Sequence, residues 1–556
     1  MDIRFPSPPL PHEAVDRLPP PPPPPPPRGS RPLAWLRRGM GWLEAQRWFL
    51  PAATAIFLGA SVEILSSSLP LPLGMLSVLG VALLVAFLVA ALYAYVRVLQ
   101  PKDVARPRSL LLIGTVILIV LLLSHYGLLV IHALSQSFPH IPFSAMRAAL
   151  PIPLGGVLLT VLFNSRLAFS GALILTILTG LMLAAPLSYF MFTFVGSVVG
   201  IFTVAGRQER TVFFRAGGAI GLANAYTLVA FALLDAETAS LTADMIGGMV
   251  NGLVVAVLAT GLLPLLEHPF GRTTVFTLLE LSNLNAPILK HLVLAAPGTY
   301  HHSIMVGTLA EAAAEAIGAN ALLCRVGAYY HDIGKTRHPG YFIENHADAG
   351  MRHEKLAPSL SRAIVISHIK EGIEIAREHG LPEILVDMIP QHHGTRLVSF
   401  FYQRARDAAD PDHSAVSEED YRYAGPRPQT REAAILMLAD TVEAATRALI
   451  DPTPARIRGV VQKIINAIFV DAQLDECDLT LRDLHIIANS FVRILTGFFH
   501  QRIEYPGVRQ DEGAKRQTEN GDQPAKSTAE GPRRDGAVKK GGARDAARAG
   551  APDSGL

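Results

Sequence analysis

The sequence predicts an all-α protein: a polytopic helical membrane domain followed by an all-helical polar domain. Half of the 556 residues are hydrophobic and only 17% are charged, whereas a soluble protein carries about 25% charged residues. Residues 48–267 form a nearly continuous apolar tract broken by short polar hinges. Residues 268–505 then change to mixed charged and apolar segments at helical period, with little of the alternating, β-branched pattern typical of strands.

Two further zones flank these domains. Residues 1–47 contain an uninterrupted proline run from Pro19 to Pro27, which has no backbone donors and is expected to be an extended or disordered spacer. Residues 506–556 are rich in Gly, Ala and charged residues and contain almost no large apolar side chains, which predicts a disordered tail.

The apolar tract predicts about eight membrane spans. A spanning helix needs about 20 mainly apolar residues. By that criterion the spans are expected at residues 48–67, 74–98, 109–134, 147–163, 168–185, 187–206, 216–234 and 243–266.

The distribution of basic residues predicts that both termini and the polar domain face the cytoplasm, in an inner or plasma membrane. Cytoplasmic loops carry an excess of Lys and Arg. The even-numbered loops are basic and the opposite loops are not, apart from Arg147; the basic positions are Arg97, Lys102, Arg106, Arg108, Arg166, Arg207, Arg210 and Arg215.

Charge and cysteine content exclude several partners and classes. The net charge of +2 is too small to indicate a nucleic-acid polymer as partner. The two cysteines, Cys324 and Cys477, form neither a disulfide framework nor a zinc-ribbon spacing. Cys324 is interpreted as a small core residue. The lipid bilayer is the partner that composition predicts, and a homo-oligomer stays open.

Histidines and aspartates form one ordered series in the polar domain, at spacings that could close a two-metal site. A single helix histidine is usually an ordinary core or surface residue, but this joint pattern is improbable by chance. The candidate metal ligands are His302, His331, Asp332, His368, His392, His393 and Asp440.

Such a set suits hydrolysis of a phosphodiester. Two cations a few ångströms apart supply a hydroxide near neutral pH and positive charge for the phosphate oxygens. Mixed His and Asp ligation favours iron, manganese or zinc over calcium. Adjacent residues on a helix point about 100° apart, so His392 and His393 can both serve only at a helix end or between two ions. Of His301 and His302, only one is expected to face the metals.

The residues carry a resemblance to a known family. The chain resembles the HD superfamily of metal-dependent phosphohydrolases and, more closely, the seven-transmembrane-receptor HD family of PgpH-type cyclic di-AMP phosphodiesterases. The matching stretches are residues 278–283, 296–303 (APGTYHHS), 331–335 (HDIGK), 341–345 (YFIEN), 367–368, 392–395 (HHGT) and 439–440.

The resemblance implies a role for each station. His302, His331, Asp332 and Asp440 would hold one divalent metal ion, and His368, His392 and His393 the second, with Asp332 bridging; manganese or iron is favoured. A hydroxide between the ions would open cyclic di-AMP to linear pApA. Asp332 and Lys335 are the catalytic candidates, and the candidate substrate contacts are Lys335, Tyr341 and Phe342.

The sequence also departs from the family pattern. Only residues 66–74 separate the first two spans, so the extracytoplasmic domain that many members carry there is expected to be absent. No Gly-Tyr-Pro signature of cyclic di-GMP-cleaving relatives is found near the ligands, which favours cyclic di-AMP. Hydrolysis of cyclic di-GMP or another nucleotide, and a nucleotide receptor without catalysis, remain alternatives.

Polar side chains inside the predicted spans are expected to bond helices to one another, which is favoured over the alternative of a small-ligand pocket. They are Glu63, His125, His132, Asn224 and Asn251, and Glu63 is the best candidate for the ligand-pocket alternative.

Overall fold

The computed structural model describes residues 48–68, 74–99, 107–234, 239–346, 349–409 and 416–499. Within these ranges every regular element is a helix, and a single isolated bridge joins Leu397 to Arg422. The all-α prediction is therefore confirmed. The predictions made for residues 1–47 and 506–556 lie outside the described residues.

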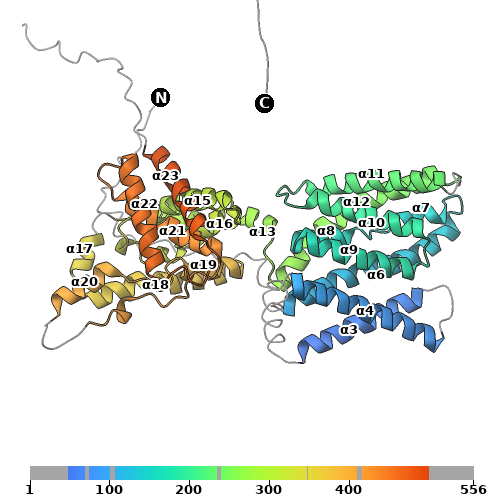
Figure 1. The fold of residues 1–556 in the computed structure, drawn as a ribbon, viewed down its shortest axis with the longest axis horizontal. Coiled ribbons are helices and arrows are strands. Elements are labelled where there is room, and N and C mark those ends of the chain that lie inside the picture. The colour runs from blue at the N-terminus through green and yellow to red at the C-terminus, as the bar shows by residue number, and fades with distance from the viewer. Residues whose placement is uncertain are drawn as a thin grey trace, which may run out of the picture. The chain divides into compact units, whose positions relative to one another are not determined.

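The apolar tract folds into long helices that lie side by side (Figure 1). Among the described residues, seven helices are long and apolar enough to cross a membrane. They are α3 (Phe49–Ser68), α4 (Met75–Leu99), α6 (Pro107–Ser137), α9 (Ser165–Met182), α10 (Leu187–Val204), α11 (Val212–Leu234) and α12 (Leu241–Phe270).

The remaining predicted span, at residues 147–163, is corrected by the structure. This segment is not one helix but two short ones, α7 (Phe143–Ala148) and α8 (Leu154–Leu162). Pro151 and Pro153 separate them, because proline cannot donate to the helix ladder and its ring clashes with the preceding turn. Neither helix reaches the length that a single span requires.

Contacts in the middle and at the end of the interrupted segment show how it runs through the bundle. In its middle, the Asn251 side-chain amide donates to the carbonyl oxygens of Ala148, at 3.1 Å, and of Leu150. At its end, the ring of Phe163 lies 4.2 Å below the Arg272 guanidinium, just past the last residue of α12. Residues 143–163 therefore follow α12 from its interior to its C-terminal end.

Polar groups in the bundle form hydrogen bonds between helices. The Asn224 amide donates to Asn251 at 3.3 Å, joining α11 to α12, and His125 Nδ1 lies 2.7 Å from the Ser68 hydroxyl, joining α6 to α3. For His125, Asn224 and Asn251 the interpretation as interhelical bonds is confirmed. His132 bonds instead within its own helix, to the carbonyl of Leu128.

In the described part of the polar region there are eleven further α-helices and three 3₁₀ helices. Some begin after a side chain that caps the first turn, such as Asn320, Thr430 and Thr480. The helices are α13 (Val275–Leu281), α14 (Pro287–Ala295), α15 (Pro297–Ala316), α16 (Ala321–Tyr330), η1 (Ile333–Thr336), η2 (Pro339–Tyr341), α17 (Ala349–Glu354), α18 (Pro358–Glu378), α19 (Glu383–Gln391), α20 (Ser399–Ala408), η3 (Glu419–Tyr421), α21 (Arg431–Arg447), α22 (Pro454–Val470) and α23 (Leu481–Phe498).

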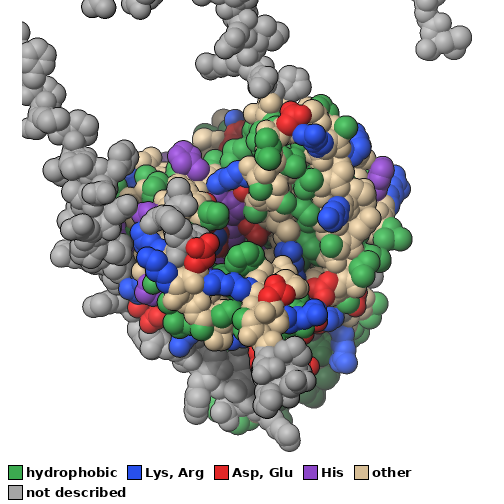
Figure 2. All heavy atoms as spheres, turned by 90° about the vertical axis from the view of Figure 1, so that its left-hand side faces the viewer, with side chains coloured by type: hydrophobic (Ala, Val, Ile, Leu, Met, Phe, Trp, Pro, Cys, Tyr) green, Lys and Arg blue, Asp and Glu red, His purple; other side chains and the backbone are tan. Residues whose placement is uncertain are grey.

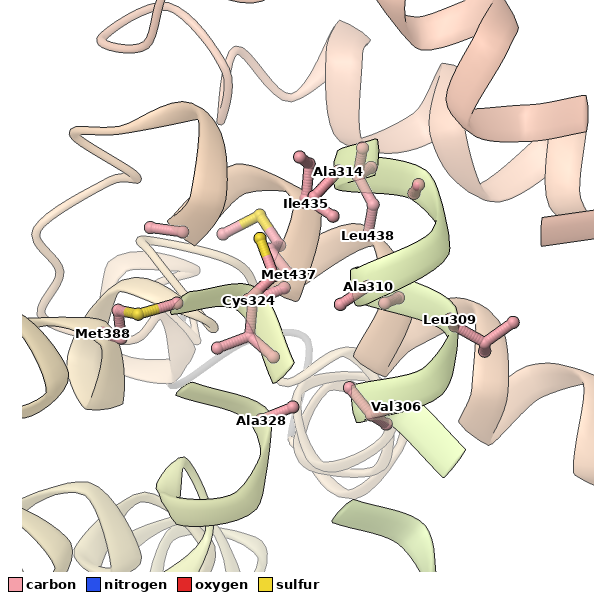
Figure 3. Close-up of a cluster of buried hydrophobic side chains, with 14 of the residues drawn as sticks. Val306, Leu309, Ala310, Ala314, Cys324, Ala328, Met388, Ile435, Met437 and Leu438 are labelled. Carbon is pink, nitrogen blue, oxygen red and sulfur yellow. The ribbon is translucent and has the colours of Figure 1, made fainter. Parts of the chain in front are cut away.

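The core of this region lies between α15, α16 and α21 (Figure 3). Residues 433–439 on α21 are fully buried, and small side chains such as Ala310 and Ala314 on α15 let the helices approach closely. Cys324 is fully buried in the same core, which confirms its interpretation as a core residue. The packing fixes the helix faces from which the histidines and aspartates project.

Candidate metal centre

The structure brings together, from five separate elements, the seven residues that the sequence singled out. His302 lies within α15, His331 and Asp332 follow the end of α16, and His368 lies on α18. His392 and His393 follow the end of α19, and Asp440 lies on α21. Six of the side chains fall into two groups, each with its ligand atoms within 4.8 Å of one another: His302, His331 and Asp332, and His368, His392 and His393. The seventh, Asp440, lies beside the first group.

The first group is rich in carboxylates. His302 Nε2 lies 2.9 Å from Asp440 Oδ1 and 3.8 Å from Asp332 Oδ2. His331 Nε2 lies 3.1 Å from the same Asp332 oxygen and 3.7 Å from Asp440 Oδ1. Two imidazole nitrogens and two carboxylate oxygens therefore surround one small volume. We refer to His302, His331, Asp332 and Asp440 as the acidic group.

The second group consists of imidazoles. The ring centres of His368 and His393 are 5.2 Å apart, and those of His392 and His393 are 3.9 Å apart. Tyr423 stacks on His393 with an angle of 10° between the rings, which fixes the orientation of that imidazole. We refer to His368, His392 and His393 as the imidazole group.

Asp332 lies between the two groups. Its Oδ2 faces His302 and His331, while its Oδ1 lies 3.4 Å from His368 Nε2 and 3.8 Å from His392 Nε2. The side chain is almost fully buried. One carboxylate can thus offer one oxygen to each group, which is the geometry of a ligand shared between two ions.

Glycine at position 334 allows this approach. A Cβ atom there would lie 1.9 Å from the carbonyl oxygen of His368 and 2.6 Å from the Gly372 nitrogen. Any side chain would therefore push η1 away from α18. The spacing His-Asp-x-Gly places Asp332 at the start of η1, and the bare backbone of Gly334 lets that turn lie against the helix that carries His368.

The pair His392–His393 stands at a helix end, as the sequence argument required. His392 caps the end of α19, and the chain turns at Gly394 with φ of 55°. Beyond the helix the 100° rotation between neighbours no longer applies, so both imidazoles reach the same group. Of the earlier pair, His302 is buried and His301 is exposed, which confirms that only one of them faces the centre.

Three buried nitrogens and one oxygen of the centre form no hydrogen bond of good geometry with the described residues: Nε2 of His331, of His368 and of His392, and Oδ1 of Asp332. A buried polar atom without a partner costs about 1–3 kcal/mol. On the opposite side of each ring, Nδ1 bonds to a backbone carbonyl three residues earlier, which turns Nε2 inward. Metal ligation would satisfy these atoms, so the residues present fit a pair of transition-metal ions.

The two groups differ in their affinity for protons. Against the opposing effect of burial, the carboxylates of Asp440 and Glu443 raise the pKa of His302 to about 9. Asp332 and Asp440 likewise outweigh burial and raise the pKa of His331 to about 10. In the imidazole group, burial lowers the pKa of His392 to about 3. The acidic group therefore holds protons that the imidazole group does not.

Lys335 lies beside the shared aspartate. Its Nζ is 2.7 Å from Asp332 Oδ2 and 2.7 Å from Glu344 Oε1, and these two carboxylates raise its pKa against the effect of burial. Phe342 packs below that ammonium, with its ring centre 5.1 Å from Nζ, and its edge meets the ring of His368. Lys335 and Phe342 thus reach the centre.

Tyr341, the third candidate substrate contact, points elsewhere. Its ring packs on His353, with the ring centres 5.5 Å apart, and its carbonyl accepts a hydrogen bond from His353 Nε2. No contact between the Tyr341 side chain and the metal-ligand candidates is seen in the described part of the chain.

Two glutamates that the sequence argument gave no role belong to the site. Glu344 holds Lys335 and accepts a hydrogen bond from the Thr299 hydroxyl at 3.1 Å. Glu443 Oε2 lies 2.6 Å from His302 Nδ1. A signal was available for Glu443, because residues three apart on a helix share a face and it follows Asp440 by three positions.

The face of the molecule in Figure 2 has a hollow, with histidine and acidic side chains inside it and Lys and Arg side chains around it. The centre itself is largely closed to solvent: the side chains of Asp440 and Lys335 keep 13% and 14% of their surface exposed, and that of Asp332 keeps 1%. A ligand from solution would therefore meet Asp440 and Lys335 before it met Asp332.

Comparison with known proteins supports the motifs. Residues 75–274 match the model of the family described as 7TM receptor with intracellular HD hydrolase, and residues 299–445 match that of the HD domain. The resemblance inferred from the motifs is thereby confirmed. Together with the seven long apolar helices, these matches identify a multi-pass membrane protein.

Two curated relatives are similar over much of the chain. The cyclic-di-AMP phosphodiesterase PgpH of Bacillus subtilis (strain 168) is 40% identical over 390 residues, which is 68% of this chain and 54% of that protein. The protein of the same name from Listeria monocytogenes serotype 1/2a (strain 10403S) is 35% identical over 432 residues, 77% of this chain and 58% of that protein. The chain therefore spans little more than half the length of these relatives.

A solved structure is also similar in sequence. The HD domain of L. monocytogenes phosphodiesterase PgpH, crystallised in complex with cyclic-di-AMP, is 49% identical, covers 39% of this chain and 100% of that chain, and superposes with a TM-score of 0.37.

Proposed function

Since the chain belongs to the family of seven-transmembrane receptors with an intracellular HD hydrolase, we propose that it is a membrane-bound, metal-dependent phosphodiesterase that hydrolyses cyclic di-AMP to linear pApA. The observation that carries the reaction type is the pair of ligand groups sharing Asp332. The substrate rests on the curated relatives, both named cyclic-di-AMP phosphodiesterase.

The metal-ligand roles are part of this proposal. His302, His331, Asp332 and Asp440 would hold one divalent ion, and His368, His392 and His393 the other, with Asp332 between them. Bound manganese or iron would supply a hydroxide near neutral pH as the nucleophile and would neutralise charge on the phosphate oxygens.

The side chains around the ions would bind and orient the phosphate. Lys335 would offer its ammonium to a non-bridging oxygen, and its two carboxylate partners support this role because they keep it charged and fix its position. Phe342 would hold the lysine from below. Tyr341 would act at the rim, where its ring is only partly buried.

We also propose that the residues from about 268 onward form the HD domain and that this domain faces the cytoplasm, as the basic loops predict. Counted as one pass, α7 and α8 together with the seven long helices would make eight, an even number that would return the chain to its starting side. Protease added to inside-out vesicles should remove this region, whereas protease added to right-side-out vesicles should not. The reverse result would overturn the orientation.

The test of the substrate uses the full chain in detergent with manganese. We expect cyclic di-AMP to be converted to pApA, measured by chromatography, at least ten times faster than cyclic di-GMP is cleaved. Turnover of cyclic di-GMP alone would replace the substrate. Tight binding of cyclic di-AMP without turnover, in protein that holds two ions, would favour a receptor.

A further inference from the structure

Of the four candidate ligands His302, His331, His368 and His392, three are oriented in the same way. His331, His368 and His392 each direct Nδ1 to the backbone carbonyl three residues earlier, at 2.7, 2.5 and 2.5 Å. Each of these carbonyl groups belongs to the helix that carries the histidine or ends just before it. The partner in every case is neutral.

His302 is the exception, because its Nδ1 faces a carboxylate. It lies on α15, and its Nδ1 is 2.6 Å from Glu443 Oε2 on α21. Both side chains are buried. Hydrogen bonds to a charged group are roughly twice as strong as neutral ones. Among these four rings, His302 alone has a carboxylate behind it.

Glu443 is itself held in place. Arg447, one turn later on α21, bonds to its other oxygen, Oε1. Asp440, three residues earlier, lies on the opposite side of the same imidazole, 2.9 Å from Nε2. The order Arg447, Glu443, His302 and Asp440 therefore runs from the half-exposed guanidinium into the acidic group.

We propose that Glu443 is a positioning residue that strengthens His302 as a metal ligand. A carboxylate accepting from Nδ1–H fixes the tautomer, turns the Nε2 lone pair inward and raises the basicity of the ring. The effect acts on the acidic group alone, because Glu443 contacts none of the imidazole group. This inference rests on the proposed two-metal site and assigns a different strength to its two halves.

The first arm of the test compares metal binding by the full chain in detergent, titrated with manganese against a fluorescent chelator. We expect Glu443→Gln, which keeps the shape and removes the charge, to weaken one of two ions by about 10- to 100-fold and to leave the other unchanged. Glu311→Gln is the matched control: Glu311 lies on α15 and pairs with Arg325 at 2.7 Å, away from the ligands, so both ions should bind as in the unaltered chain.

The second arm places Glu443→Gln in a His302→Ala background. If Glu443 acts through His302, the double variant should bind manganese as His302→Ala does. The double variant stays informative if Glu443→Gln alone fails to fold, because it lacks the His302 imidazole that would otherwise lose its carboxylate partner. An equal loss in both backgrounds, or full affinity in Glu443→Gln, would overturn the inference.

The two levels of the argument fail differently. An unaltered chain that binds fewer than two ions would remove the proposed metal site. Two ions bound by the unaltered chain, with no change in Glu443→Gln, would leave that site intact and reject only the role of Glu443.

Discussion

The acidic group and the imidazole group present the same kind of nitrogen to a metal, yet they are built differently. Two carboxylates, Asp332 and Asp440, face the imidazoles of the acidic group, and Glu443 stands behind one of them. The imidazole group meets a single carboxylate oxygen, Asp332 Oδ1, at 3.4 Å or more. Charge is therefore concentrated on one side of the shared aspartate.

This difference shows how one carboxylate can serve two unlike sites. In the acidic group the negative charges attract protons as well as metal ions, and both histidine pKa values are raised. In the imidazole group burial keeps the rings neutral and ready to ligate. The two halves should thus differ in how metal binding depends on pH and on each ligand.

The largest effect is expected where the two groups meet. Asp332→Ala removes the oxygen atoms that face both groups, so both ions should be lost, together with charge stabilisation worth several kcal/mol. We expect hydrolysis of cyclic di-AMP to fall by about 1000-fold or more. Metal content and turnover measured on one preparation check this, and an active Asp332→Ala variant would refute the proposed metal site.

Single-ligand variants should separate the two groups. His302→Ala and His393→Ala should each retain only the ion of the unaltered group, and should lose about 100-fold or more in turnover, since a two-ion reaction needs both ions. Metal analysis after passage over a chelating resin measures the retained ion. His301→Ala, which alters an exposed neighbour, is the control and should keep both ions; equal metal loss in all three variants would contradict the assignment.

The pH dependence of metal binding should differ between the groups. Neutral imidazole is the form that ligates. His302 and His331 have pKa values raised to about 9 and about 10, so near pH 7 an ion entering the acidic group must displace their protons, and its affinity should rise about tenfold or more per pH unit.

The imidazole group should behave differently, because the pKa of His392 is lowered to about 3 and that of His368 is also lowered. Its rings are already neutral at pH 7, and its affinity should be nearly constant from pH 6 to 8. Calorimetric titration in buffers of different ionisation enthalpy counts the released protons. Equal proton release for the two ions would erase the distinction.

The smallest effect concerns the contact that holds the groups together. Gly334→Ala places a Cβ atom 1.9 Å from the His368 carbonyl, and overpacking of this kind costs about 1–3 kcal/mol. We expect a lower melting temperature and a weakened ion in the imidazole group. Gly459→Ala is the control, because Gly459 lies on α22 and a Cβ atom there would have no neighbour within 4 Å. It should leave both ions in place, so a loss of metal there as well would show that glycine replacement acts through general stability.

Much of this site could be predicted because its ligands stand in short, specific stretches. The His-Asp dipeptide before Gly334 and the His392–His393 pair before Gly394 both indicate helix ends, and the structure places them there. The seven-residue set came from order and spacing together with a family resemblance. The buried position of His302 rather than His301 could not be derived from sequence order, since both are adjacent on one helix.

Other features needed the fold. Glu344 and Glu443 are ordinary charged residues in the sequence, and only tertiary packing sets one against Lys335 and the other against His302. The interruption between α7 and α8 was missed for a different reason. Residues 147–163 are apolar enough for a span, and hydropathy outweighed the helix-breaking effect of Pro151 and Pro153.

The interrupted segment also has a consequence for how the chain is assembled in time. The carbonyl groups of Ala148 and Leu150 bond to Asn251, which is 103 and 101 residues further along the chain. During synthesis those carbonyl groups are therefore made well before their partner. We therefore expect a stage of folding in which residues 143–163 lack their contact with α12. Asn251→Leu should block the last step of folding, after the earlier helices have inserted.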